Sequence, residues 1–356
     1  MSSSPEDDRA PLTAAVLAVG QLVGRDVVAD LSALAPGSEV LWTPYTETIE
    51  QRRERRRRHR AGEAHPETKL TDEQRSTLAA AHAVLAFDVP WELPALAPNL
   101  RLLQAVGAGI EQYDLDGLRA AGVSLCNASG IAAPSMAEFI VGRIVEVFKG
   151  TRQVEQLQRD QRWQRHDTRE LAGSTVAVVG LGAIGRATAR RLRGWDVTML
   201  GTRRRVEEGA TDPDVDEVIA SDQLDMVLRR ADVVVLTVPA TPETDRMFDA
   251  DRFAAMKPGA VFCNVSRGSM VDEDALVDAL ERGHLGAAIL DVTRVEPLPA
   301  EHRLWHAPNL YLSPHSSTSV DRYAPRLLEL YADNLGRLAS GQPLHNRVDP
   351  TLGYRG

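Results

Sequence analysis

Short apolar runs alternate with longer amphipathic runs along most of the chain, a pattern typical of an α/β protein with parallel sheets. The first part of the chain has five candidate strands, which are Ala14–Val19, Glu39–Trp42, Ala83–Phe87, Leu102–Val106 and Val123–Cys126. The second part has six more, which are Thr175–Gly180, Val197–Gly201, Val233–Val238, Ala260–Val265, Ala287–Val292 and Leu310–Ser313. Two doubly wound parallel-sheet domains fit these series better than one large sheet.

A glycine-rich turn follows the first strand of the second series. Gly180, Gly182 and Gly185 come directly after a β-branched apolar run, and an Ala/Arg-rich segment of helical pattern begins at once. This order is typical of a dinucleotide-binding unit, whose glycines permit a tight turn, backbone contact with the pyrophosphate and close helix–strand packing. The free N–H groups at the helix start favour phosphate. We therefore expect a dinucleotide site here, and a purely structural turn is the alternative.

The residues after the next strand indicate which dinucleotide is bound. An Asp or Glu at that position would accept the ribose 2′-hydroxyl of NAD. Here the strand leads into Thr202, Arg203, Arg204 and Arg205, with no acid at its end. A guanidinium suits a phosphate, which a carboxylate would repel. The sequence therefore favours NADP (NADPH) over NAD, and the alternative is that these arginines are solvated surface groups.

Two further segments are open to more than one interpretation. A predicted helix over Ala137–Lys149 is apolar on several sides, which either core packing or a subunit interface would explain. An Arg-rich run over residues 51–60 reads better as a solvated helix face than as a nucleic-acid or anion patch. The acids expected to neutralise it are Glu47, Glu50, Glu54 and Glu63.

Composition and charge narrow the function classes. The 356 residues are enough for two domains, and the net charge of −9 argues against a general nucleic-acid binder. Cys126 and Cys263 are the only cysteines, so neither a disulfide framework nor a Cys-based metal cluster is expected. The acidic, polar N-terminus is unlike a signal peptide, and no uncharged apolar run is long enough to span a membrane. We expect a cytoplasmic protein with no metal and no membrane partner.

Three charged side chains follow successive strands of the second series. Arg267 comes after one strand, Glu296 follows the next, and His315 follows the last. Because the carboxyl ends of parallel strands form the ligand crevice of such a sheet, these side chains could meet there. An arginine binds a carboxylate through two hydrogen bonds, and a carboxylate beside an imidazole favours the protonated ring. The set would provide an anion site and a proton donor usable near neutral pH.

Four motifs in order carry a resemblance to a known family. They are Gly180-x-Gly182-x-x-Gly185, Asn264-x-x-Arg267-Gly268-x-x-Val271-Asp272-x-x-Ala275-Leu276, Asp291-Val292-x-x-x-Glu296-Pro297 and Ser313-Pro314-His315. Together they resemble the D-isomer-specific 2-hydroxyacid dehydrogenase family, over a stretch from about Leu102 to the C-terminus. The first hundred residues match mainly in pattern.

The resemblance implies a split architecture. A Rossmann nucleotide-binding domain over residues 127–316 would be inserted into a flavodoxin-like substrate domain. That substrate domain would comprise residues 1–126 and a return over residues 317–356. The resemblance also implies a homodimer formed through the Ala137–Lys149 helix.

The resemblance further implies roles for individual residues. Arg267 looks like the arginine that binds the substrate carboxylate, His315 like the acid/base, and Glu296 like the partner that keeps the histidine protonated. The backbone of Ala108 and Gly109 would help hold the carboxylate. The implied cofactor contacts are Gly180, Gly182, Ala183, Ile184, Gly185, Thr202, Arg203, Arg204, Val238, Pro239, Thr244, Val265, Ser266, Arg267, Asp291 and His315.

The implied activity is NADP(H)-preferring interconversion of a 2-oxo acid and a D-2-hydroxy acid, as in the glyoxylate/hydroxypyruvate reductase branch. The missing acid after the second strand is similar to that branch, and Thr293 stands where the family often has an aromatic. The Glu at 296 speaks against the formate dehydrogenase branch, and the lack of a C-terminal regulatory domain against phosphoglycerate dehydrogenase. Two alternatives stay open: an NAD-dependent enzyme that oxidises a D-2-hydroxy acid, and a dinucleotide-sensing, corepressor-like binding protein.

Overall fold

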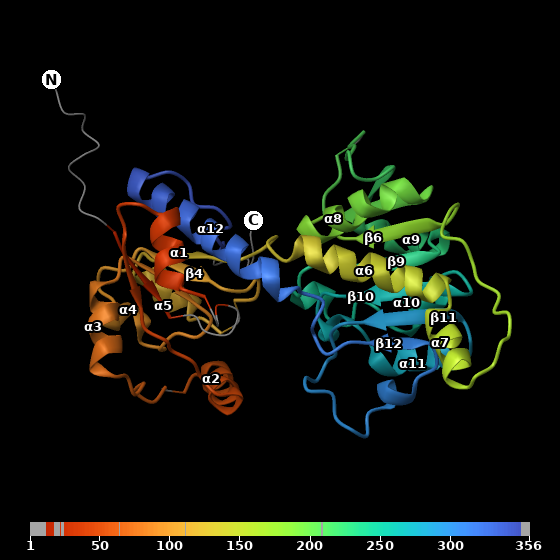
Figure 1. The fold of residues 1–356 in the computed structure, drawn as a ribbon, viewed down its shortest axis with the longest axis horizontal. Helices are drawn as coiled ribbons and strands as arrows, with labels where there is room; N and C mark the ends of the chain where they lie inside the picture. Colours follow the sequence, from red (N-terminus) through yellow and green to blue (C-terminus); the bar gives the residue numbers. More distant parts are fainter. Residues whose placement is uncertain are drawn as a thin grey trace. The chain divides into compact units, whose positions relative to one another are not determined.

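The computed structural model describes residues 12–17, 22, 25–63, 65–110, 112–207 and 209–349. The chain divides into two compact units, both shown in Figure 1. Unit 1 takes the chain up to Ile131 and from Val320 onward, and unit 2 is Ala132–Ser319. The chain therefore leaves the first unit, builds the second, and returns. Among the described residues, no helix is long and apolar enough to cross a bilayer.

Unit 1 is built on a five-stranded parallel sheet with the order β2-β1-β3-β4-β5. This order is that of flavodoxin-like domains. The strands are β1 (Thr13–Val16), β2 (Glu39–Trp42), β3 (Ala83–Ala86), β4 (Leu102–Ala105) and β5 (Ser124–Cys126). All five were expected; β1 ends earlier than predicted, and residues 18 and 19 of the expected strand lie outside the described part.

Helices cover both faces of this sheet, so β1, β3 and β4 are buried along their whole length. The helices are α1 (Val27–Leu34), α2 (Ile49–Ala61), α3 (Asp72–Ala80), α4 (Leu93–Leu96), α5 (Leu115–Ala120) and α12 (Val320–Ser340). The last helix packs beside α1 and ties the C-terminal return to the sheet. The buried Tyr331 donates to the Ala15 carbonyl at 3.4 Å, and Asn334 donates to the Gln104 side chain at 2.9 Å.

Unit 2 holds a seven-stranded parallel sheet with the order β12-β11-β10-β9-β6-β7-β8. The strands are β6 (Thr175–Val179), β7 (Thr198–Arg203), β8 (Glu217–Ala220), β9 (Val233–Leu236), β10 (Ala260–Asn264), β11 (Leu285–Leu290) and β12 (Leu310–Leu312). This is the Rossmann order extended by one strand, with the switch point between β6 and β9. The sequence did not predict β8, an edge strand with a single buried residue, Ile219.

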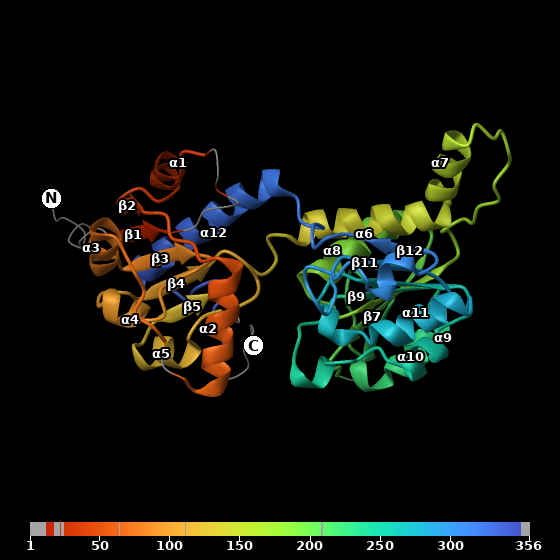
Figure 2. The same ribbon diagram turned by 90° about the horizontal axis from the view of Figure 1, so that it is seen from below.

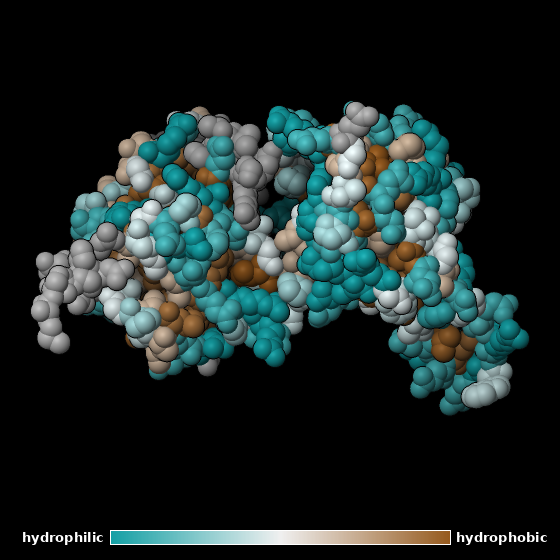
Figure 3. All heavy atoms as spheres, turned by 90° about the horizontal axis from the view of Figure 1, so that it is seen from above, coloured by the Kyte–Doolittle hydropathy of each residue, from teal (hydrophilic) through white to brown (hydrophobic). Residues whose placement is uncertain are grey.

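The helices of unit 2 are α6 (Ala133–Phe148), α7 (Thr151–Arg159), α8 (Ala183–Leu192), α9 (Leu224–Arg230), α10 (Ala250–Ala255) and α11 (Glu273–Glu281). The apolar helix expected at Ala137–Lys149 is α6, which packs along α8 and buries Ile140, Ile144 and Phe148. Beyond it, α7 projects away from the sheet (Figure 2) and has no buried residue. The space-filling view shows apolar surface on this projection (Figure 3). Val154 of α7 is half-exposed.

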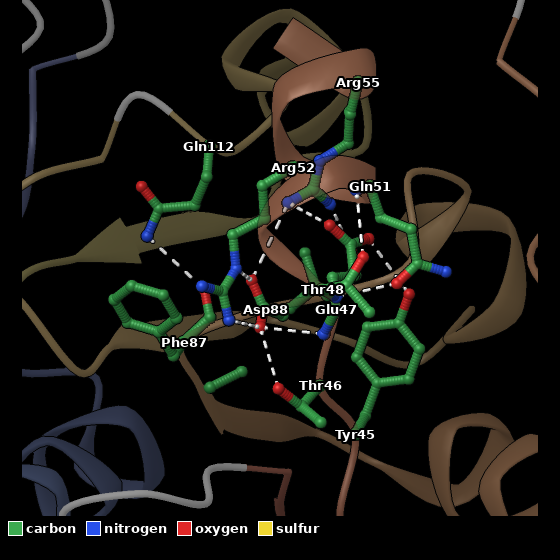
Figure 4. A network of polar contacts seen from close by, with 12 residues as sticks. Tyr45, Thr46, Glu47, Thr48, Gln51, Arg52, Arg55, Phe87, Asp88 and Gln112 are labelled. Carbon is green, nitrogen blue, oxygen red and sulfur yellow. Dashed lines mark hydrogen bonds and ion pairs between the residues drawn. The ribbon is translucent and has the colours of Figure 1, made fainter. Parts of the chain in front are cut away.

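The Arg-rich run forms α2, but its arginines are not all solvated. Arg52 forms two hydrogen bonds to the buried Asp88 carboxylate, at 2.8 and 2.7 Å. Arg55 is buried, donates to the Val89 carbonyl at 2.7 Å and lies 2.9 Å from the Glu47 carboxylate (Figure 4). The expectation of a solvated face neutralised by acids was therefore wrong for Arg52 and Arg55, which point inward. Outer members of the run do pair with acids on the surface, such as Arg57 with Glu54 and Glu63.

Candidate active site

The glycine-rich turn joins β6 to α8, and each glycine has a different steric reason. Gly180 has φ +105°, and a Cβ there would lie 2.8 Å from a Val238 methyl group. A Cβ on Gly185 would lie 2.2 Å from the Gly180 carbonyl oxygen. A Cβ on Gly182 would meet nothing within 4 Å, so the backbone there faces open space. The turn therefore has no room for a side chain at Gly180 and Gly185, whereas at Gly182, where α8 begins, its backbone is accessible.

The start of α8 offers hydrogen-bond donors beside this open glycine. Its N-cap is Gly182, and no side chain caps the helix. Helix N-termini carry unsatisfied N–H groups and a partial positive charge, which suit the pyrophosphate of a dinucleotide. The predicted contact Ala183 is exposed at this position, whereas the Ile184 side chain packs toward α6. The turn fits a dinucleotide on its sterics and on its free donors.

Two threonines hold the turn in place. The Gly180 amide donates to Thr202 Oγ1 at 3.2 Å, and the Leu181 amide donates to the Thr202 carbonyl at 3.0 Å. On the other side, Thr237 Oγ1 donates to the Gly180 carbonyl at 2.7 Å. Thr202 was predicted as a cofactor contact, but its buried hydroxyl supports the turn. Sequence reasoning missed Thr237, which has no motif signal beyond its place at a strand end.

The arginines after β7 do not act as a uniform group. The Arg203 guanidinium forms an ion pair with the buried carboxylate of Asp212, which also lies 2.6 Å from Arg186 of α8. The charge of Arg204 instead contributes to lowering the pKa of Glu243, after the larger effects of hydrogen bonds from Thr241 and the Glu243 backbone. The expectation that no acid serves this strand end was incomplete, because Asp212 reaches it through a loop.

The segment after β9 carries three predicted cofactor contacts. Val238 packs against Gly180, and Pro239 follows it. The Thr244 hydroxyl accepts from the Thr241 amide at 2.8 Å and donates to the Pro239 carbonyl at 2.9 Å, so it shapes the short helical turn Pro242–Thr244. Val238 therefore stands closest to the glycine-rich turn, whereas the Thr244 hydroxyl is engaged within its own loop.

A buried asparagine shapes the loop that carries Arg267. The Asn264 side chain accepts from the Ser266 amide at 2.9 Å and donates to the Arg267 carbonyl at 3.0 Å. The Ser266 hydroxyl donates to the Leu236 carbonyl at 3.0 Å, and the Val265 side chain packs in the core. These two predicted cofactor contacts can therefore offer backbone only. The Arg267 side chain is partly buried and donates to the Ser266 carbonyl at 2.8 Å.

Gly268 brings this loop against the loop after β11. A Cβ on Gly268 would lie 1.9 Å from the carbonyl carbon of Thr293. No side chain larger than a hydrogen fits between the two backbones. The residue after Arg267 is thereby fixed against Thr293, three residues before Glu296.

Asp291 organises the last loop of the site. Its buried carboxylate accepts from the Ser313 hydroxyl at 2.5 Å, from the Ser316 amide at 2.9 Å and from the Ser317 amide at 3.1 Å. Its carbonyl accepts from the His315 amide at 2.8 Å. These bonds surround His315, which has a φ of +52°, a value uncommon outside glycine. The contact of Asp291 with a nicotinamide amide stays a prediction, whereas its support of the His315 loop is seen directly.

His315 and Glu296 come together as expected. His315 Nδ1 lies 2.9 Å from Glu296 Oε2, and Glu296 Oε1 accepts from the Thr293 amide at 3.1 Å. Both side chains are about half-exposed. The pair borders a hollow of about 630 Å³ whose walls are mostly apolar. The hollow is lined by Asp291, Thr293, Glu296, Pro297, Leu298, Trp305, Leu312, Ser313, Pro314 and His315.

The predicted carboxylate loop belongs to unit 1. Ala108 is exposed and Gly109 partly so, at the carboxyl end of β4. The Asn127 side chain donates to the Ala108 carbonyl at 3.0 Å, and the Ala128 amide donates to the Gly107 carbonyl at 2.9 Å. The loop is therefore held from β5 and leaves the backbone of residue 108 at the surface of its unit. Within the described residues, no cluster of three or more His, Cys, Asp or Glu side chains could hold a metal ion.

Comparison with known proteins agrees with this geometry. The family model for the NAD-binding domain of D-isomer specific 2-hydroxyacid dehydrogenases matches residues 141–317. A glyoxylate reductase from Thermofilum pendens is 33% identical over 254 residues, covering 69% of this chain and 74% of the relative. A glyoxylate/hydroxypyruvate reductase B from Escherichia fergusonii is 31% identical over 263 residues, covering 72% of this chain and 80% of the relative.

A solved structure extends the match over nearly the whole chain. The D-isomer specific 2-hydroxyacid dehydrogenase from Xanthobacter autotrophicus, in complex with NADPH and MES, is 30% identical with a TM-score of 0.74. The similarity covers 97% of this chain and 100% of that one. The chain therefore belongs to the D-isomer specific 2-hydroxyacid dehydrogenase family and is an oxidoreductase that acts on a CH–OH group.

Proposed function

We propose that this protein reduces a small 2-oxo acid to the D-2-hydroxy acid and prefers NADPH as the reductant. The observation that carries the proposal is the His315–Glu296 pair, with Nδ1 and Oε2 2.9 Å apart. It stands on the same sheet edge as the Arg267 loop and the glycine-rich turn. A proton donor, an anion-binding guanidinium and a dinucleotide cradle are the three parts that such a reaction needs.

When bound, the dinucleotide supplies the hydride that reduces C2 of the substrate. Arg267 binds the substrate carboxylate through its guanidinium, exchanging the bond that it now makes to the Ser266 carbonyl. A role for the backbone of Ala108 and Gly109 in holding the carboxylate stays a prediction. Fixing the carboxylate also fixes the direction of the adjacent carbonyl group.

His315 donates the proton that the carbonyl oxygen takes up. Its Nδ1 is engaged by Glu296, so the proton comes from Nε2. Glu296 is itself held by the Thr293 amide, and it stabilises the positive ring before transfer. In the reverse direction Nε2 accepts the hydroxyl proton of a D-2-hydroxy acid. Asp291 takes no proton and serves to hold the loop on which His315 stands.

The preference for NADPH rests on the end of β7 and the residues directly after it. Arg203, Arg204 and Arg205 follow one another there, and no acidic residue ends the strand. A related enzyme of known structure, from Xanthobacter autotrophicus, was solved with NADPH. The arginine-rich loop supports the same dinucleotide here, because a 2′-phosphate adds charge that guanidinium groups attract.

A spectrophotometric screen tests the proposed function. Glyoxylate, hydroxypyruvate, pyruvate and bulkier 2-oxo acids are offered with NADPH or NADH, and consumption of reduced nicotinamide is followed. We expect turnover of at least one small 2-oxo acid and a higher kcat/KM with NADPH. A protein that binds NADPH and turns over no 2-oxo acid of the panel would instead be a dinucleotide-sensing binding protein.

We also propose that the protein is a homodimer formed through α6. Beside its buried face, α6 carries the partly exposed apolar side chains Phe139, Val141, Val145 and Val147, three of which also pack against the core. Apolar side chains that stay partly exposed along a helix fit a surface covered by a second subunit. Light scattering after size exclusion should give twice the mass of the chain, and a monomer at micromolar concentration would contradict the proposal.

A further inference from the structure

Two arginines from different elements converge beside the glycine-rich turn. Arg203 ends β7, and Arg186 lies in the first turn of α8. Arg186 NH1 lies 2.6 Å from Asp212 Oδ2, and Arg203 NH2 pairs with that same oxygen. The two guanidinium groups are therefore side by side, although the residues are separated by a helix and a strand.

Asp212 is buried beneath this pair. Its side chain is only 1% exposed, and its other oxygen accepts from the Asp214 amide at 3.0 Å. The Asp214 carboxylate in turn pairs with Arg190 at 2.8 Å and lies 3.7 Å from Arg186. A buried carboxylate is costly unless it is paired and hydrogen-bonded, and here one oxygen of Asp212 is held by the Asp214 amide while the other faces the two guanidinium groups. Asp212 thus brings a negative charge to a strand end that lacks its own acid.

The paired guanidinium groups keep donors for a ligand. Each arginine has five N–H donors, and Asp212 engages one nitrogen of each. The side chains of Arg186 and Arg203 are each 32% exposed, so their outer edges reach the surface. Thr202, next to Arg203, holds Gly180 and Leu181, which places the pair beside the turn. In this fold the adenosine ribose is read at the end of that second strand.

We propose that Arg186 and Arg203 together bind the 2′-phosphate of NADPH and that Asp212 is the residue that positions them. The inference rests on the proposed preference for NADPH and assigns that preference to two arginines from separate elements. It differs from an interpretation in which consecutive arginines of the β7 loop act alone. Asp212 contacts the guanidinium groups and not the phosphate, so it is a positioning residue.

The direction of an Asp212 substitution follows from two opposing effects. Removal of the carboxylate charge makes the site more positive, which attracts a phosphate at long range but is screened by salt. It also leaves two like charges in contact on a partly buried surface, so one guanidinium turns away and the pair is no longer preorganised. Contact at hydrogen-bond distance depends on preorganisation more than on net charge, so we expect weaker binding of the 2′-phosphate.

Binding of nucleotide fragments to the protein without cofactor separates these effects from catalysis. Adenosine 2′,5′-bisphosphate and AMP are titrated by calorimetry into the wild type, Arg186→Gln, Asp212→Asn and Arg191→Gln. The first two variants should bind the bisphosphate about tenfold more weakly and AMP with unchanged affinity. Arg191→Gln is the matched control, because Arg191 lies on the same helix and pairs with Glu138. It should bind both fragments like the wild type.

Kinetics give a second readout. In Arg186→Gln and Asp212→Asn the KM for NADPH should rise, while the KM for NADH and kcat with either cofactor stay within twofold. Loss of affinity for both fragments and both cofactors alike would mean that Asp212 only stabilises the fold, which overturns its positioning role. Arg186 has a partly exposed side chain, so its variant keeps the test valid if Asp212→Asn does not fold.

The inference and the function on which it rests fail differently. A wild type that binds the bisphosphate no better than AMP overturns the NADPH preference, and the phosphate site with it. A wild type that prefers the bisphosphate, with Arg186→Gln and Asp212→Asn that keep this preference, overturns only the two-arginine site. In that case the phosphate would be read elsewhere in the β7 loop.

Discussion

The Nδ1 atom of His315 and the Oε2 atom of Glu296 lie 2.9 Å apart, while the other oxygen of Glu296 takes the Thr293 amide. Because a carboxylate can only accept, this contact places a hydrogen on Nδ1 of the ring. The ring is therefore oriented from its Nδ1 side, and Nε2 is left for the substrate. A backbone amide three residues earlier in the chain sets the position of the carboxylate.

Substitution of Glu296 should slow reduction. Glu296→Gln keeps the size of the side chain and an acceptor, but removes the charge that stabilises the positive ring before proton transfer. A charge-assisted hydrogen bond contributes about 1.5–3 kcal/mol, so kcat should fall by about tenfold or more, with a smaller change in the KM for NADPH. Steady-state kinetics check this, with the exposed Glu301→Gln as the control. An unchanged kcat for Glu296→Gln would remove its role.

Replacement of Arg267 by lysine should weaken substrate binding even though the positive charge is kept. Arg267→Lys keeps the positive charge and loses the paired donors that match a carboxylate. We expect the KM for the 2-oxo acid to rise by about tenfold or more, with a smaller change in the KM for NADPH. Arg294→Lys is a suitable control, because the Arg294 guanidinium donates to the Ser269 carbonyl. Equal KM values for the Arg267 variant and the wild type would place the carboxylate site elsewhere.

The contact between Gly268 and Thr293 predicts a steric effect. In Gly268→Ala the new methyl group would overlap the Thr293 carbonyl carbon, so the two loops must separate. Overpacking of this kind costs about 1–3 kcal/mol, and separation would also displace Arg267 from the Glu296 loop. The free energy of unfolding, measured with denaturant, and kcat/KM should both fall. Gly336→Ala, where a Cβ meets nothing, should instead stabilise α12 by about 0.5–1 kcal/mol.

Both cysteines should be unreactive in the native protein. Burial raises the pKa of Cys126 to about 12 and raises that of Cys263 as well. Since the thiolate is the reactive form, an aromatic disulfide reagent at pH 8 should find almost none in the folded chain. Two thiols should react after unfolding in guanidinium. Rapid reaction of the native protein would show that one of them is accessible.

Features that depend on neighbours in the chain were predictable from the sequence. The strand, the glycine-rich turn and the helix after it are one local unit, in which Gly180 and Gly185 meet the close contacts that were expected. Arg267, Glu296 and His315 follow strand ends, so the parallel sheet brings their loops to one edge. The contact between Glu296 and His315 could be predicted because both residues lie in short loops at that edge.

Features that depend on distant pairing were not predictable. Asp212 reaches Arg203 through an irregular loop, and no periodicity shows that this acid is buried there. The edge strand β8 has too few buried residues for an apolar pattern. The inward direction of Arg52 and Arg55 depends on the fold, which places Asp88 beneath them from the end of another strand. For Asp212 and for these two arginines, a charge on one segment is matched by a charge on another segment that no local pattern links to it.

Because two of its arginines point inward, the basic run of α2 should behave differently in the folded protein and in a free peptide. A free peptide of residues 51–60 would be a flexible polycation, ready to adhere to heparin, RNA or acidic membranes. In the folded protein the same residues hold α2 in place, because Arg52 pairs with Asp88 and Arg55 pairs with Glu47. A search for localisation signals by basic residues alone would therefore flag this helix and misread it.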